Sequence, residues 1–101
     1  PLARAYAETE AAELVARKAA ALFEAGVPCG AEANMAKLLC AEAGWHAAEA
    51  CMQTFGGFAF AREYDIERKW REARLYLTAP ISTNLVLAYL GQHVLGLPKS
   101  Y

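Results

Sequence analysis

The sequence predicts an all-α protein, an antiparallel up-down helical bundle that forms one domain over residues 1–101. Long segments are rich in Ala, Leu, Glu, Lys and Arg, which are strong helix formers. Apolar residues recur within these segments at helical spacing, and Gly or Pro stands where each segment ends. No stretch alternates apolar and polar residues as a half-buried strand does. Four helices are therefore expected.

The first helix is predicted over residues 2–25, and Gly26 and Pro28 end it. Its expected apolar stripe contains Leu14, Val15, Ala21, Leu22 and Phe23. The second helix is predicted over residues 31–54, beginning near Cys29 and Gly30. Its expected stripe contains Met35, Leu38, Leu39, Trp45 and Met52.

A third helix is predicted over residues 66–77 with Asp65 as its N-cap, and a fourth over residues 80–95 with Pro80 in its first turn. The first two helices are about 24 residues each, close to 36 Å at 1.5 Å per residue. The last two are shorter. A square four-helix bundle needs four helices of comparable length, so we expect one long helix of the bundle to be missing from this chain.

The composition excludes several classes of partner. Hydrophobic residues make up 56% of the chain, charged residues 21%, and the net charge is -1. That balance argues against a nucleic acid held by phosphate neutralisation. No apolar run reaches the roughly 18 residues of a membrane span. A cytoplasmic protein is expected. The chain begins with Pro1 rather than methionine, which indicates a piece of a longer protein.

The spacing of the cysteines and histidines does not indicate a disulfide or a metal site. Cys29, Cys40 and Cys51 are eleven residues apart. On a helix, Cys40 and Cys51 stand about 16 Å apart, too far for a disulfide or a shared metal. They are interpreted as free, buried thiols in a reducing compartment. His46 and His93 lack ligand-type neighbours and are interpreted as packing or surface residues.

The charges near the third helix are interpreted as a solvated, ion-paired face. Arg68, Arg71 and Arg74 also suit anion binding, but acidic residues interleave with them and make this less favoured. Trp45 and Trp70 are interpreted as core or interface anchors.

The stretch QTFGGFAF, residues 53–60, interrupts the helical pattern. Gly56 and Gly57 permit positive φ and close approach of another backbone or a ligand. From the residues alone, a helix-ending turn and a binding segment remain equally open, because a short glycine motif is weak evidence.

The order of residues around this stretch resembles the signature of the acyl-CoA dehydrogenase family. The run QTFGGFAFAREYDIERKWREARLYL holds a glutamine three residues before GG and aromatics that flank a small residue. Acidic-aromatic, Glu-Arg and Arg-acid-Ala-Arg elements follow, and Met35-Ala36-Lys37 matches upstream. The matching positions are Gln53, Gly56, Gly57, Phe58, Ala59, Phe60, Glu63, Tyr64, Glu67, Arg68, Arg71, Glu72, Ala73 and Arg74.

The resemblance covers nearly the whole chain and implies most of the family's C-terminal helical domain, without that domain's first helix. It implies FAD at an interface of a homo-oligomer, a dimer or tetramer. The segment would reach the adenosine diphosphate half of a neighbouring subunit's FAD. The cofactor-binding residues implied there are Gln53, Thr54, Phe55, Gly56 and Gly57.

The match weakens after Arg74. Pro80 stands where many family members carry the catalytic glutamate, so no catalytic residue is assigned in this chain. Ser82 keeps the hydroxyl of the family's threonine for the flavin or its phosphates, and Asn84 keeps a polar partner. The base is either relocated, or the chemistry is lost or changed.

The resemblance therefore implies an oxidoreductase of fatty acid metabolism, an FAD-dependent enzyme that oxidises an acyl-CoA thioester between its α and β carbons. The 101-residue chain is expected to be inactive alone. The alternative is a non-catalytic helical assembly module in which GG is only a turn. A free-standing four-helix signalling bundle is disfavoured by the unequal rods.

Overall fold

The computed structural model describes residues 1–99, which form helices and no strand. Two long helices come first, α1 (Leu2–Glu24) and α2 (Gly30–Phe55). Two short 3₁₀ helices, η1 (Gly56–Phe60) and η2 (Arg62–Tyr64), turn the chain into α3 (Ile66–Leu75). A loop leads to α4 (Thr83–Tyr89), which continues as a π-helical turn, η3 (Leu90–Val94). The expected all-α, four-helix class is confirmed.

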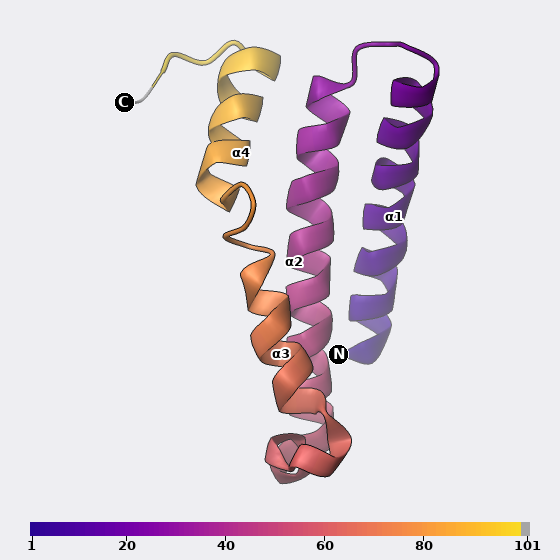
Figure 1. Cartoon of the computed structure of the whole chain (residues 1–101), viewed down its shortest axis with the longest axis vertical. Helices are drawn as coiled ribbons and strands as arrows, with labels where there is room; N and C mark the ends of the chain where they lie inside the picture. Colours follow the sequence, from indigo (N-terminus) through magenta and orange to yellow (C-terminus); the bar gives the residue numbers. More distant parts are fainter. Residues whose placement is uncertain (100–101) are drawn as a thin grey trace.

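The long helix α2 lies between the other helices (Figure 1). On one side it packs against α1, and on the other side against α3 and α4. Within residues 1–99, α1 makes no contact with α3 or α4. The arrangement is an open bundle in which α2 contacts α1, α3 and α4. Within residues 1–99, no further long helix completes the bundle.

Alanine forms the seam between α1 and α2. The buried row on α1 is Ala5, Ala12 and Ala19, and the matching row on α2 is Ala36, Ala43 and Ala50. The other buried alanine of α2, Ala41, lies beside Tyr76 and Pro80 instead. A spacing of seven residues is two helical turns, so each row keeps to one face. Since the distance between packed helices depends on the side chains at the contact, alanine rows let these two helices approach closely.

The stripe expected on the first helix is confirmed only in part, since Val15 and Leu22 are half-buried but the other three residues are exposed. Leu14 and Phe23 expose 70% and 77% of their surface, whereas the alanines at positions 5, 12 and 19 are buried. Because α1 has a single helical neighbour, only one narrow face is covered, and that face carries alanine. On α2 the expected stripe is half-buried except Leu39, which is exposed.

Two predicted helix starts differ in their capping. Asp65 occupies the N-cap position of α3, but its side chain makes no capping hydrogen bond. Instead its carboxylate accepts from Arg68 Nε at 3.2 Å. The fourth helix begins at Thr83 rather than at Pro80, because Ser82 is its N-cap and accepts from the Leu85 backbone N–H at 3.4 Å. Pro80 lies in the preceding loop.

The cysteines are free thiols, as expected, but they are not all buried. Cys40 is exposed, and Cys29 and Cys51 are half-buried. The Cys40 thiol donates a hydrogen bond to the Ala12 carbonyl at 3.6 Å.

Candidate functional site

The two adjacent glycines serve different purposes in the chain. Gly56 has φ 57° and ψ -134°, and its backbone N–H donates to the Met52 carbonyl. This left-handed φ strongly favours glycine, so Gly56 is the residue that ends α2. Gly57 has no positive φ, and a Cβ atom built on it would meet nothing within 4 Å. Nothing in this chain's own packing requires glycine at position 57.

The three residues before the glycines lie exposed on the last turn of α2. Thr54 Oγ1 already donates to the Ala50 carbonyl at 2.7 Å, and the Phe55 ring lies 5.7 Å from the Tyr64 ring. Gln53 has no such engagement among residues 1–99. Its amide is therefore the side chain of the three that is available to an external group.

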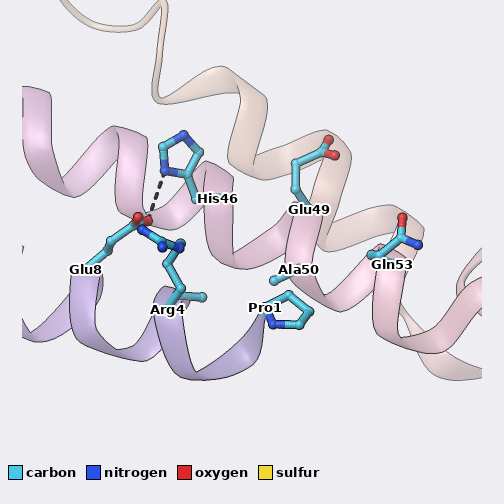
Figure 2. A pocket seen from close by; sticks show the side chains of 8 residues that line it. Pro1, Arg4, Glu8, His46, Glu49, Ala50 and Gln53 are labelled. Atoms are coloured by element: carbon cyan, nitrogen blue, oxygen red, sulfur yellow. Dashed lines mark hydrogen bonds and ion pairs between the residues drawn. The ribbon is translucent and has the colours of Figure 1, made fainter.

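Gln53 borders two grooves. One, of about 230 Å³, is shared with Glu49, Met52, Gly56 and Phe60. The other, of about 430 Å³, lies between α1 and α2. Figure 2 shows the larger groove from close by, with Gln53 at one end and the Glu8–His46 pair at the other. Nδ1 of His46 lies 3.0 Å from the Glu8 carboxylate, so this histidine joins the two helices.

Ser82 and Asn84 lie away from the glycines. They line a pocket of about 360 Å³ with residues from the middle of α2, including Trp45. Trp45 precedes Gln53 by eight residues, which is about 12 Å along a helix. The structure therefore presents the predicted cofactor residues as two separate surfaces, one at the end of α2 and one at its middle.

The side chain of Pro80 has no group that could accept a proton. It lines a small apolar pocket with Lys37, Cys40 and Tyr76. The Lys37 ammonium donates to the Tyr76 carbonyl, which ties α2 to the end of α3. Within residues 1–99, no group of three or more His, Cys, Asp or Glu side chains is arranged to hold a metal ion.

The charged face of α3 is ion-paired, as predicted. Arg68 bonds to Asp65 and Glu72, and Arg71 bonds to Glu67 at 2.8 Å. The hydrogen bond from Arg71 lowers the pKa of the Glu67 carboxyl, and burial opposes this effect. Hydrogen bonds to Asp65 and then Glu72 raise the pKa of Arg68. These groups are exposed, so each pair stabilises the chain only slightly.

Sequence reasoning named Arg74 as suited to anion binding, but it missed Glu42 and the pocket that both line with Ser82 and Asn84. Glu42 and His46 from α2 and Arg74 from α3 also line it. Arg74 lies over the Trp45 ring, 5.6 Å from its centroid, and the Trp45 and Trp70 rings are tilted by 36° with 5.4 Å between their centroids. The signal available in the sequence was the i, i+4 spacing of Glu42 and His46, which places both on one helix face.

The fold and site define a helical domain that offers an open glycine turn and exposed grooves. The chain belongs to the acyl-CoA dehydrogenase family, because the profile of the acyl-CoA dehydrogenase C-terminal domain matches residues 1–80. The resemblance seen in the sequence is thereby confirmed.

Relatives support the same assignment. Acyl-CoA dehydrogenase FadE12 of Mycobacterium tuberculosis is 43% identical over 100% of this chain and 26% of its own length. The mitochondrial short/branched chain specific acyl-CoA dehydrogenase of Rattus norvegicus is 30% identical over 92% of this chain and 22% of its own length. The chain thus spans about a quarter of the curated relatives it matches. No solved structure matches it significantly.

Within residues 1–99, no helix is both long and apolar enough to cross a membrane, as the sequence predicted.

Proposed function

We propose that this chain is the C-terminal part of an FAD-dependent acyl-CoA dehydrogenase that oxidises an acyl-CoA thioester between its α and β carbons. Its family membership and the names of its relatives support the reaction class. Bound FAD supplies the acceptor for the hydride that leaves the β-carbon, while a base removes the α-proton. This chain provides contacts to the cofactor and between subunits.

Gly57 is the observation that carries the proposal. It has neither the backbone conformation nor the crowded surroundings that make glycine necessary within this chain. An open backbone at an exposed turn suits an anionic cofactor, because backbone N–H groups can approach it without an intervening side chain. Gln53, one helical turn earlier, has an unengaged amide beside the groove that it shares with the preceding glycine, Gly56. Gln53, Gly56 and Gly57 therefore fit the adenosine diphosphate half of FAD held by a neighbouring subunit.

The second surface suits the same cofactor chemistry. The Ser82 oxygen accepts from the Leu85 N–H, which leaves its O–H proton available to a flavin or phosphate oxygen. Asn84 is exposed on the same pocket. Thr54 and Phe55 are assigned a supporting role, since their own contacts fix the last turn of α2.

The base is proposed to lie outside this chain. Proline has no proton-accepting side chain, and Pro80 occupies the position where the family pattern has a glutamate. We therefore propose that the 101-residue chain alone neither retains FAD nor oxidises thioesters. Many large apolar side chains are exposed, among them Phe58, Phe60 and Leu95, which supports a homo-oligomer, a dimer or tetramer, that covers them. A cytoplasmic location stays a prediction.

The test is FAD occupancy of the full-length protein with Gly57→Val, measured from the flavin absorbance per polypeptide. The branched side chain should intrude where the cofactor approaches and lower the occupancy. Gly44→Val is the matched control, because Gly44 also has nothing within 4 Å of a built Cβ and no positive φ. Full flavin in a folded Gly57→Val protein would support the alternative, a non-catalytic assembly module in which GG is only a turn.

Gln53→Ala in the same full-length protein should weaken FAD binding by about 1 kcal/mol, the scale of one hydrogen bond. Equilibrium titration of the apoprotein with FAD measures this effect. Unchanged affinity would remove Gln53 from the site. Gln92→Ala is the control, since it removes the same amide at a position that lines neither groove of Gln53.

A further inference from the structure

Lys37 is the last residue of the Met35-Ala36-Lys37 match, and the proposed function gives it no role. It lies on α2, and its ammonium donates to the backbone carbonyl of Tyr76, 39 residues later in the chain. Tyr76 is the residue at which α3 ends. This hydrogen bond therefore joins one helix to the C-terminal end of another. Figure 1 shows the loop that follows, between α3 and α4, beside α2.

The turn after α3 leaves the Tyr76 carbonyl without a backbone partner. The carbonyls of Ala73, Arg74 and Leu75 accept from N–H groups of the residues that follow them. Within residues 1–99, no backbone N–H reaches the Tyr76 carbonyl, and Lys37 is its donor. The C-terminal end of a helix favours a cation, because its carbonyl groups give it a partial negative charge. The Lys37 ammonium is thus suited to fix this end of α3.

The Leu77 carbonyl, one residue after Tyr76, holds the start of α4. It accepts from the Thr83 backbone N–H at 3.1 Å and from Thr83 Oγ1 at 3.0 Å. Thr83 is the first residue of α4, and Ser82 is its N-cap. Because the peptide unit is planar and each residue has only two soft dihedral angles, fixing the Tyr76 carbonyl restricts the direction of the Leu77 carbonyl. Two successive contacts therefore connect Lys37 to the residue beside Ser82.

The rest of α4 is held less specifically. Among residues 1–99, no hydrogen bond or ion pair joins α4 itself to α2. Val86 is the buried residue of α4, with 1% of its surface exposed. Burial of apolar surface is not directional, so it holds α4 against the bundle without fixing the direction of a hydroxyl at its first turn. The position of Ser82 therefore depends on the loop that Lys37 holds.

We propose that Lys37 is a positioning residue, which places the Ser82 hydroxyl for the cofactor through the end of α3 and the hydrogen bonds between Leu77 and Thr83. Lys37 lines a separate apolar pocket with Pro80 and not the pocket of Ser82, so it acts without touching the cofactor. The inference rests on the proposed function for Ser82. It adds a residue that lies outside both proposed binding surfaces.

The first test is equilibrium titration of the full-length apoprotein with FAD. Lys37→Met keeps an unbranched apolar side chain but removes the ammonium, and it should weaken FAD binding about fivefold, the affinity equivalent of one hydrogen bond. Lys37→Arg keeps a cationic donor and should restore most of the affinity. Lys18→Met is the matched control and should leave the affinity unchanged, because Lys18 pairs with Glu32 and lies on α1, which makes no contact with α3.

A double-mutant cycle separates positioning from a general loss of stability. In a Ser82→Ala background, Lys37→Met should have no further effect on FAD affinity, because the hydroxyl that Lys37 places is already absent. A merely structural role would lower the affinity by the same factor in both backgrounds. Thr83→Val tests the second link with Lys37 intact. It removes the Oγ1 hydrogen bond to the Leu77 carbonyl and should also weaken FAD binding.

Crystal structures of the full-length protein with and without Lys37→Met measure the displacement directly. The loop of residues 76–82 and the Ser82 hydroxyl should move in the variant, while α2 stays in place. An unmoved Ser82, or equal losses of FAD affinity in both backgrounds, overturns the inference. Unchanged FAD affinity in Ser82→Ala alone instead rejects the proposed role of Ser82 in cofactor binding, and a displaced loop in Lys37→Met then still supports Lys37 as the residue that positions it.

Discussion

The pair formed by α1 and α2 and the part of the chain from Gly56 onward use opposite means to define their shape. The helix pair is long, regular and joined by rows of alanine. The later part consists of short helices fixed by individual features: a left-handed glycine, an N-cap serine, and the packing of Trp70 and Arg74 against Trp45 of α2. The proposed binding surfaces lie where the two parts meet, since Gln53 is at the end of α2 and Ser82 shares its pocket with residues of α2.

This difference predicts where each part is sensitive to substitution. A close helix seam fails when a side chain becomes larger, since neither helix can move away without losing the whole row of contacts. A region that depends on a few specific contacts loses stability when one of those contacts is removed, whereas most other positions in it tolerate substitution. The following variants test this contrast, in order of decreasing effect.

Ala12→Leu should have the largest effect on the 101-residue chain. Ala12 exposes only 3% of its surface on the seam, so a leucine forces the helices apart. The expected loss in the free energy of unfolding is about 1–3 kcal/mol, measured by urea denaturation. Ala20→Leu, at an exposed position on the same helix, is the control and should be near neutral. Equal stability of the two variants would refute the close alanine seam.

Gly56→Ala should come next. Its φ of 57° and ψ of -134° are unfavourable for a residue with a Cβ atom. The expected loss is about 1–2 kcal/mol, the scale of a strained backbone position. Gly57→Ala, one residue later, should change stability little, because it lacks a positive φ and has open space around it. Thermal unfolding of both variants measures the difference. Similar losses at the two positions would show that Gly57 also has a structural role.

Ser82→Ala should cost about 1 kcal/mol, the usual value of an N-cap side chain. The Leu85 N–H then loses its side-chain acceptor, so the first turn of α4 is less stable. Ser82→Thr is the conservative control, because it keeps a hydroxyl at the cap. Helix content from circular dichroism, together with urea denaturation, measures the effect. Equal stability of Ser82→Ala and the unmodified chain would show that the cap contributes nothing.

The smallest effect concerns the exposed Glu67–Arg71 pair. The pKa of Glu67 is lower in the folded chain than its ordinary value. Its contribution is therefore present above the unfolded pKa and is lost as the pH falls through the folded pKa. NMR titration of the Glu67 carboxyl should show a higher pKa in Arg71→Gln. An identical titration in both proteins would contradict the pairing, and Lys69→Gln serves as the control.

Much of the fold follows from the sequence alone. Helix-forming composition, with Gly26 and Gly56 as stop signals, predicts both long helices to within a residue or two of their observed bounds. These signals are local, and local backbone preferences depend on few neighbours. The family also follows from the sequence, because the order of residues from Gln53 to Arg74 is a pattern of residue types and needs no geometry.

Only the tertiary structure decided which faces are buried and which groups meet. Hydropathy favoured Leu14 and Phe23 for the core of the first helix, but α1 touches one helix and covers its alanine face instead. The start of α4 depended on whether Ser82 or Pro80 governs the turn, a choice made by one hydrogen bond. Glu42 and Arg74 are 32 residues apart in sequence and line one pocket because α3 packs against α2. Contacts between distant segments depend on the packing of whole helices, which residue order does not express.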